Sequence, residues 1–245
     1  MTIRSSRTLA AFCGALALSV STGAARAESS GMDWLGVVYL WGADIQVDAG
    51  DRSVDASFSD IIDTLEMGFM GHVEAQGDTF GGFVDVVYMS VSDSRAIGPV
   101  SARGELDMAL MDVAIVWNPS PERYTGFDVY GGFRYIGVDF DLRATLTPPP
   151  DPTFRTGIDT SYTDFLIGGR YVAPINDRWR LVFSGDLSGG DTEGSWSLAG
   201  YGVYRNGPHR FYAGYRHLEA EVKGNAGRTV DQTFSGPAVG YGFAF

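Results

Sequence analysis

Apolar and very small residues alternate most regularly in the last fifteen residues of the chain, 231–245. Val239, Tyr241, Phe243 and the terminal Phe245 occupy every second position, and the positions between them hold glycine or alanine. Successive side chains of a β-strand point to opposite faces, so this segment presents one bulky apolar face and one face of small residues. The bulky face suits lipid, and the small face suits the interior of a narrow barrel. We predict that 231–245 is the closing strand of a membrane β-barrel.

The same alternation predicts ten strands, joined by connections of two kinds. Short turns follow the even-numbered strands and longer loops follow most odd-numbered ones, as in outer-membrane barrels. The predicted fold is therefore all-β, a transmembrane antiparallel up-and-down barrel of ten strands, with eight strands as the alternative. An irregular alternation at Leu110 and Met111 predicts a bulge. The predicted strands are 34–48, 67–76, 79–92, 101–117, 125–145, 157–173, 179–188, 193–205, 211–222 and 231–245.

A soluble β-barrel or sandwich is the alternative to a membrane barrel. The small inner positions of the closing strand and the aromatic residues at strand ends favour the membrane barrel, because aromatic girdles mark both membrane interfaces. These strand-end aromatics are Trp34, Trp41, Tyr88, Trp117, Tyr124, Tyr171, Trp179, Trp196 and Tyr204.

Residues 1–27 have the pattern of a secretory signal peptide. Arg4 and Arg7 precede a short apolar run from Leu9 to Val20, and residues 25–27 fit the small-x-small cleavage pattern. The run is too short to cross a bilayer as a helix. Cys13 raises the alternative of a lipoprotein, but bulky Phe12 precedes it. We predict a signal peptide, 1–27, and one outer-membrane β-barrel domain, 28–245.

The charge of the chain is strongly acidic, with 30 acidic residues against 18 basic ones. Removal of the leader takes away three of these basic residues, all arginines, together with the one cysteine. The exported chain should therefore have neither a basic surface for nucleic acid nor a disulfide framework. The expected location is the outer membrane of a Gram-negative bacterium. The expected partners are outer-membrane lipids, lipopolysaccharide, and the chaperones and insertion machinery of barrel assembly. We expect no nucleic-acid partner, cofactor or metal.

Three predicted strands repeat a glycine, any residue, arginine and then an aromatic or histidine residue, around Arg134, Arg170 and Arg216. A charge on the lipid face near mid-bilayer costs roughly 2–4 kcal/mol, so the arginines should point inward. The alternation places several carboxylates on the same inner face. The result is either a salt-bridged, mostly plugged interior or a charged constriction that selects solutes. The predicted lumen charge network is Glu74, Asp85, Asp112, Arg134, Arg170, Asp186 and Arg216.

The first long loop contains a segment, 57–65, with the pattern of a short helix. Ser57 and Asp60 have the spacing of a capping box, and an apolar face follows. Two helical turns are not stable alone, so another surface must cover this face. We expect the segment to fold over or into the outer mouth as a partial plug; an ordinary surface loop is the alternative. The predicted plug residues are Phe58, Ile61, Ile62 and Leu65.

Two resemblances accompany these patterns. Alternate aromatics that end at Phe245 resemble the C-terminal strand of outer-membrane barrels, which implies that Tyr241, Phe243 and Phe245 form the insertion signal. Several motifs, with the Gly-x-Arg-Tyr strands, resemble a family of uncharacterised, small porin-like outer-membrane barrels of proteobacteria. That resemblance implies a barrel and its location, and no activity. Its motifs are Tyr39-Leu40-Trp41, residues 54–62, 71–75 and 82–89, and residues 236–240.

Three functions remain open for such a barrel. The first is a structural or narrow-pore, porin-like barrel with a charged interior. The second is an outer-surface binding or adhesion protein that acts through its loops. The third is an enzyme acting on lipid or peptide, for which His217 with Glu219 or Asp44 is the one combination worth testing, because a nucleophile, base and orienting acid must lie within reach of one another. We expect no enzyme activity.

Overall fold

The computed structural model describes residues 31–49, 52–57, 59, 61, 65–97, 100–120, 122–146, 153–223 and 229–245. Every element in this part of the chain is a β-strand, and no helix in it is long and apolar enough to cross a membrane. The predicted leader lies outside the described residues. The strands are β1 (Asp33–Trp41), β2 (Asp44–Ala49), β3 (Arg52–Ala56), β4 (Leu65–Gln76), β5 (Phe80–Ile97), β6 (Val100–Trp117), β7 (Gly126–Leu146), β8 (Thr153–Pro174), β9 (Trp179–Gly190), β10 (Gly194–Asn206), β11 (His209–Lys223) and β12 (Thr229–Ala244).

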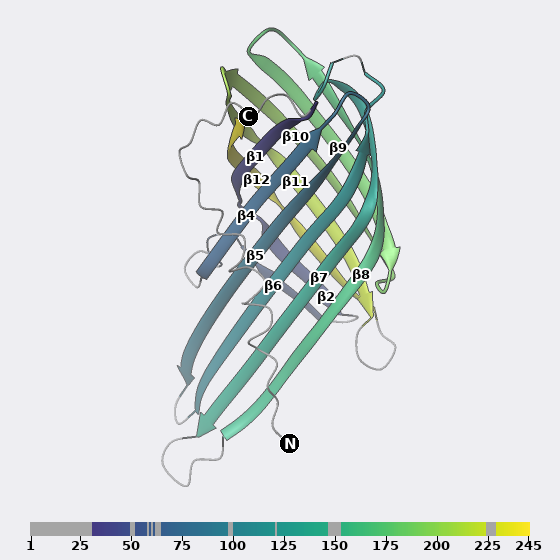
Figure 1. Ribbon diagram of the computed structural model, residues 1–245. Coiled ribbons are helices and arrows are strands. Elements are labelled where there is room, and N and C mark those ends of the chain that lie inside the picture. The colour runs from purple at the N-terminus through teal and green to yellow at the C-terminus, as the bar shows by residue number, and fades with distance from the viewer. Residues whose placement is uncertain are drawn as a thin grey trace. The chain divides into compact units, whose positions relative to one another are not determined.

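The strands form one closed antiparallel sheet, because β1 pairs with β4 on one side and with β12 on the other (Figure 1). β1 and β2 follow β12 in a single register, with Trp41 opposite Ala238 and Asp44 opposite Ser235. The two strands are separate elements because Pro237 has no N–H to donate at this point, although its carbonyl accepts a 2.8 Å hydrogen bond from Gly42. β1 and β2 therefore act as one barrel strand, and the barrel has the ten strands that were predicted.

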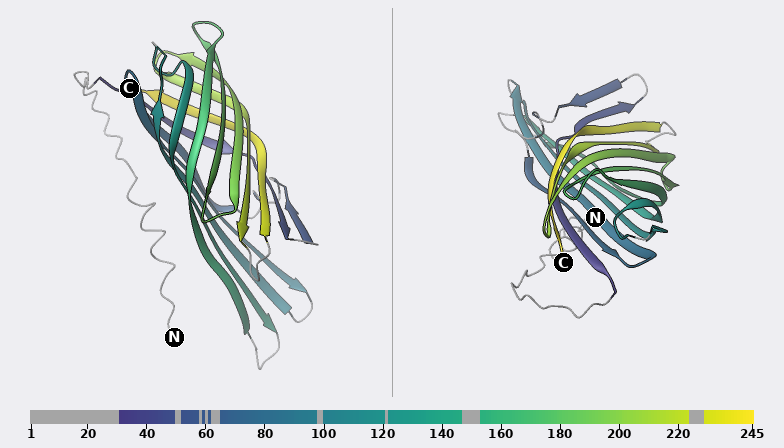
Figure 2. Two further views of the ribbon diagram at one scale, coloured as in Figure 1. Left: turned by 90° about the vertical axis from the view of Figure 1, so that its right-hand side faces the viewer. Right: turned by 90° about the horizontal axis from the view of Figure 1, so that it is seen from above.

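The barrel wall is incomplete beside β4. The β1–β4 ladder ends where Val38 lies opposite Gly71, and beyond it the Trp41 N–H donates to the Met70 sulfur over 3.1 Å. The β2–β3 hairpin turns away from the wall at this point (Figure 2). The hairpin extends the sheet from β12 without pairing to β4.

Two local predictions are wrong. The β5–β6 and β6–β7 registers run without interruption past Leu110 and Met111, so the predicted bulge is absent there, and the register shift of β4 lies between Leu65 and Met67 instead. The predicted loop at 93–100 is mostly strand, because β5 and β6 continue their pairing as far as Ile97 opposite Val100. The polar residues of that stretch, including Asp93, resemble a loop in sequence but lie on a strand that extends beyond the barrel.

The predicted plug segment lies mostly outside the described residues, which include Ser57, Ser59 and Ile61 but not Phe58 or Ile62. The Ile61 N–H donates to the Ser57 carbonyl over 3.1 Å, and the Ile61 side chain is buried. The backbone is α-helical at both Ser59 and Ile61, as the predicted pattern requires, while the rest of the predicted helix lies outside the described residues. Leu65 begins β4.

A band of large apolar side chains covers the outside of the barrel. On β9 and β12 every outward position in the band is apolar, from Trp179 to Leu187 and from Val239 to Phe245, while the residues between them point inward. A sheet that closes on itself pairs its backbone groups between strands, and with this exterior it presents hydrocarbon to lipid, which defines a transmembrane β-barrel. Trp41 departs from the predicted girdle, because it points into the lumen and is only 5% exposed.

Strands β5 to β8 continue past the other strands at the end of the barrel opposite the C-terminus and the start of β1 (Figures 1 and 2). We call this end the loop end, the opposite end the turn end, and the extension of β5–β8 the projection. Side-chain polarity inverts along these strands. On β7, Phe133 faces out and Arg134 faces in within the barrel, whereas in the projection Asp141 faces out, paired with Arg155. Phe140 and Leu142 lie on the inner face there, beside Gly104.

Candidate functional site in the lumen

The lumen of the barrel is lined by small residues on one side and by ion pairs on the other. β12 contributes Ala238, Gly240 and Gly242 to the inner face, so long side chains from the facing strands have room to cross the lumen. Gly168 has the same role on β8, because a Cβ there would lie 2.4 Å from the ring of Tyr130. The predicted small inner face therefore makes space for the charged groups.

Arg134 is the centre of a first cluster and has no solvent exposure. Its Nε and Nη2 each donate to a carboxylate oxygen of Asp112 over 2.8 Å, in a bidentate pair. Its Nη1 lies 2.9 Å from the Asp186 carboxylate and donates to the Ser195 hydroxyl over 3.0 Å. Such charge-assisted forks are among the strongest polar contacts in proteins, so Arg134 ties β6, β9 and β10 to β7.

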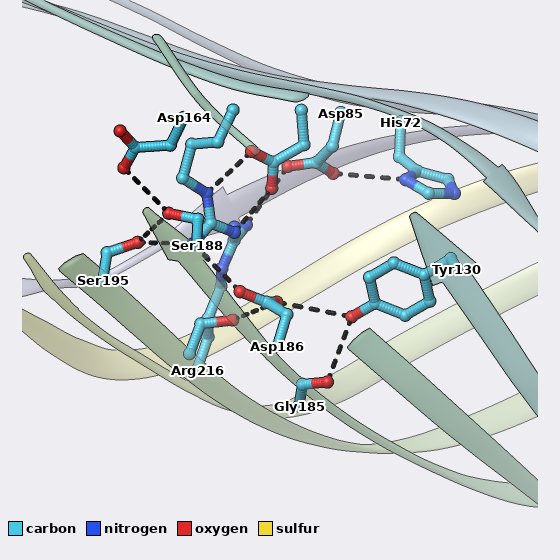
Figure 3. Close-up of polar contacts among 12 residues, drawn as sticks. His72, Asp85, Tyr130, Asp164, Gly185, Asp186, Ser188, Ser195 and Arg216 are labelled. Atoms are coloured by element: carbon cyan, nitrogen blue, oxygen red, sulfur yellow. Dashed lines mark hydrogen bonds and ion pairs between the residues drawn. The ribbon is translucent and has the colours of Figure 1, made fainter. Parts of the chain in front are cut away.

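Hydroxyl groups surround this first cluster (Figure 3). Ser197 and Tyr130 donate to the second oxygen of Asp186, over 2.5 Å and 3.3 Å. On the loop-end side, Asp164 accepts hydrogen bonds from the Ser188 hydroxyl over 3.1 Å and from the Thr192 amide over 3.0 Å. Ser188 in turn lies 2.6 Å from Ser195.

A second cluster begins at Arg170, nearer the turn end. Its two terminal nitrogens donate to Glu74 over 2.6 Å and 2.7 Å, and its Nε donates to Asp128 over 2.7 Å. Glu74 continues the chain to His72, whose Nε2 lies 3.3 Å away, and the His72 Nδ1 lies 3.2 Å from Asp85. The imidazole is therefore held between two carboxylates, at the hydrogen-bonding distances of a bridging group.

Arg216 ends the second cluster on its loop-end side. Its Nη1 donates to Asp85 over 3.2 Å and to the Tyr39 hydroxyl over 3.0 Å, and that hydroxyl donates to the same carboxylate over 2.8 Å. The guanidinium carbon lies 4.9 Å from the ring centre of Trp41, within the range of a cation–π contact. Trp41 thus joins the charged clusters to the apolar residues above them.

An apolar layer spans the lumen immediately towards the loop end. Its residues come from β1, β11 and β12 on one wall and from β6 and β7 on the other, and they pack in one buried cluster. We call this layer the seal. The side chains of these two walls pack against one another in it. The seal consists of Trp41, Leu110, Ile136, Leu218, Ala220, Phe234 and Ala238.

The turn-end half of the lumen is hollow instead. A cavity of about 570 Å³ lies between the ion pairs and the short turns. Its inner end is formed by Glu74, Asp85, Arg170 and Arg216, and its walls by aliphatic and tyrosine side chains of the barrel. A cavity of this size falls in the range of small-molecule binding sites.

The structure places all seven residues of the predicted charge network in the lumen: Glu74, Asp85, Asp112, Arg134, Arg170, Asp186 and Arg216. It divides them between two clusters. Arg134 is the cation of the first cluster, and Arg170 and Arg216 lie at the two ends of the second. Sequence reasoning missed Asp128, Asp164 and the bridging role of His72. The alternation could have found both acids, since Asp128 shares a face with Arg134 and Asp164 shares one with Arg170.

The histidine considered for catalysis lies on the outer face of the barrel. His217 packs on Trp196 with ring centres 4.6 Å apart, and its Nε2 lies 3.9 Å from Glu219. Asp44 lies on β2, which pairs with one edge of β12, whereas His217 lies on β11, which pairs with the other edge. Both residues lie opposite Ser235. No group of three or more histidine, cysteine or acidic side chains among the described residues is arranged to hold a metal ion.

The chain matches no protein-family model and no curated protein. Solved structures that resemble it include the outer-membrane protease OmpT of Escherichia coli, at 12% identity over 87% of this chain and 97% of that one, with a TM-score of 0.47. Ail, the attachment invasion locus protein of Yersinia pestis, matches at 8% identity over 88% and 99%, with a TM-score of 0.39. Neisserial surface protein A matches at 13% identity over 88% and 98%, with a TM-score of 0.30. All three TM-scores are below 0.5, so the function must be inferred from this chain's own residues.

Proposed function

We propose that this protein is a non-conducting outer-membrane β-barrel, a structural barrel whose charged interior stabilises it and does not conduct solutes. The observation that carries the proposal is the seal, in which apolar side chains from opposite walls are buried against one another. A water-filled pore requires a polar interior along its whole length. Buried Arg134 and its carboxylates form ion pairs at the next level of the lumen.

The orientation follows from the connections. The start of β1, the C-terminal residue Phe245 and the short turns lie at one end of the barrel, which is the periplasmic end of outer-membrane barrels. The projection then stands outside the cell, with its outer face in water. The inversion of polarity along β7 supports this arrangement, because Phe133 meets lipid and Asp141 meets solvent on the same strand.

Planar-bilayer conductance tests the proposal. The protein is purified after export and reconstituted beside a known open porin, and folding is checked by heat-modifiable migration on a gel. We expect the wild-type protein to be silent under conditions in which the porin conducts. Discrete conductance steps from the folded wild-type protein would overturn the proposal and support the narrow-pore, porin-like alternative.

A second candidate function is outer-surface binding through the projection. Its support is the length of β5–β8, which carry 18 to 22 residues each and exceed the other described strands. A bilayer needs about 9–11 residues per tilted strand, so the remainder is not required for spanning. The extra length makes sense if the projection contacts something outside the membrane.

Cysteine labelling on intact cells tests the orientation that both candidates need. With the predicted leader 1–27 removed the chain lacks cysteine, so Ser101→Cys in the projection and Asp177→Cys in a turn each give a single thiol. Both positions are exposed. A membrane-impermeant maleimide should label the first on intact cells and the second only after the outer membrane is opened. The reverse pattern would refute the orientation.

A further inference from the structure

The turn-end cavity carries three cations that the ion-pair clusters do not use. Arg180 on β9, Arg205 on β10 and Arg210 on β11 all line it, on three adjacent strands. Arg205 and Arg210 lie directly opposite each other in the ladder, and Arg180 lies opposite Val203, two residues from Arg205. Like charges at directly opposite positions destabilise a sheet. We call these residues the turn-end arginines.

None of the turn-end arginines forms an ion pair within the described part of the chain. Arg180 Nη1 donates to the Tyr124 carbonyl over 2.7 Å and to the Thr125 hydroxyl over 3.0 Å. Arg210 Nη1 donates to backbone carbonyls of the β10–β11 turn, at Gly207 and His209. These hydrogen-bond partners are neutral, and Glu122 acts on Arg180 only through its charge, without a direct ion pair.

The side-chain carboxylates that line the same cavity are already engaged. Glu74 binds Arg170, Asp85 binds Arg216, and at the rim Asp33 lies 3.2 Å from Arg123. This contrast matters because the chain as a whole has far more acidic than basic residues. A group of unpaired arginines in an acidic protein is a site for an anion that comes from outside the chain.

The mouth of the cavity is also held in a defined shape. Tyr124, which lines it, has a φ of 55°, a left-handed conformation that is uncommon for a residue with a side chain. Its hydroxyl donates to the Asp33 carbonyl over 2.6 Å, and its own carbonyl accepts from Arg180. Backbone strain of this kind is concentrated at ligand clamps and other functional sites. Tyr124 therefore joins the β6–β7 turn to β1 and to one of the turn-end arginines.

We propose that this cavity binds a small organic oxyanion, with a phosphate or carboxylate group on the turn-end arginines and an aromatic or apolar body along the barrel wall. The planar guanidinium group matches both oxyanions in geometry. Leu35, Val37, Val182 and Tyr212 supply apolar and aromatic surface beside it. The periplasmic access of the ligand rests on the orientation in the proposed function, whereas binding itself does not.

Calorimetric titration of the purified protein in a neutral maltoside detergent tests the site. The probes are phenyl phosphate, benzoate, inorganic phosphate and phenol. We expect phenyl phosphate or benzoate to bind with one site per chain, inorganic phosphate to bind more weakly, and phenol not to bind. Added NaCl should weaken the binding, since ion pairing drives it. The absence of binding by every anion would overturn the proposal, whether or not the barrel conducts.

Variants identify the residues that bind the probe. Arg180→Gln and Arg210→Gln should each weaken binding by roughly tenfold, the usual effect of losing one charged hydrogen bond. Arg103→Gln is the matched control, because Arg103 is an exposed arginine of the projection, bonded to Glu105 over 2.9 Å. Equal affinity in all three variants would refute the site.

Thermal unfolding without ligand separates a binding role from a structural one. Removal of one of three repelling cations should leave the unfolding temperature of Arg210→Gln unchanged or raised, while the shift caused by phenyl phosphate should shrink. A lowered unfolding temperature together with an undiminished ligand shift would show that Arg210 is structural and would contradict the proposal.

Discussion

The two halves of the lumen hold arginine in opposite settings. In the loop-end half, Arg134 is fully buried and meets two carboxylates and a hydroxyl. In the turn-end half, Arg180 faces a cavity and meets a carbonyl and a hydroxyl. A buried charge is tolerated when its partners belong to the same fold, whereas a charge without such partners remains available to a ligand. One half therefore stabilises the barrel, and the other is suited to binding.

Arg134→Ala should give the largest effect. It leaves Asp112 and Asp186 buried without their cation, which costs roughly 3–5 kcal/mol when one partner of a buried pair is removed. Unfolding by urea in lipid vesicles measures the loss. Arg180→Gln is the comparison variant and should lose far less. Equal losses at the two arginines would remove the distinction between the halves.

The second test compares two outward positions of β7. Phe133 is 52% exposed within the apolar band, so Phe133→Arg should lose roughly 2–4 kcal/mol of unfolding free energy in vesicles. Asp139→Arg lies on the same face in the projection and should lose little, because the acidic side chains of Asp159 and Asp141 act on this position. If Asp139→Arg were as costly as Phe133→Arg, the projection would not stand outside the bilayer.

The third test concerns the seal. Leu218 is 3% exposed, and Leu218→Ala should cost roughly 2–3 kcal/mol, in the lower part of the range for such core truncations. Leu198, on the lipid face of the adjacent strand, is 56% exposed and provides the control, Leu198→Ala. Similar losses at both positions would mean that the seal is not packed as a core.

The smallest effect is a pH dependence within the projection. Burial and the neighbouring Asp159 raise the pKa of Asp139, while the guanidinium of Arg155 lowers the pKa of Asp141. Asp139 therefore opposes folding when ionised, and Asp141 favours it. Asp139→Asn should be more stable than wild type at pH 7, and the difference should shrink as the pH falls below the raised pKa and vanish below the ordinary pKa of an aspartate. Asp141→Asn should be less stable at pH 7, with the difference lost only below the depressed pKa.

Unfolding of both asparagine variants between pH 3 and pH 7 checks these signs. The two positions lie two residues apart on one face of β7, so differences in their surroundings, and not in depth, decide the result. The same sign at both positions would show that their neighbours do not control these carboxylates.

Much of the fold could be predicted from the sequence, because strand periodicity is a local property. The alternation around Phe243 and Arg134 identifies the outward and inward faces, and turns such as Gly77 and Asn206 separate the strands. The local pattern failed where two environments share one strand. Asp93 was assigned to a loop because its surroundings are polar, although β5 continues through it into the projection.

The partners of the inward residues depend on tertiary structure alone. Alternation shows that Arg134 and Arg216 point inward, but strand tilt and register determine that the first meets Asp112 and the second meets Asp85 and Trp41. The placement of Trp41 inside the lumen is of the same kind, since an aromatic at a strand end fits a girdle equally well.

By itself, the sequence determined a ten-stranded barrel with an apolar exterior and inward charges, because a two-residue period needs no knowledge of distant strands. The tertiary structure decided which charges neutralise one another, which apolar residues close the lumen, and which arginines remain unpaired. Those outcomes depend on the level along the barrel axis at which each side chain lies. The register between β12 and β1 fixes that level when the barrel closes, and residues more than 200 positions apart become neighbours.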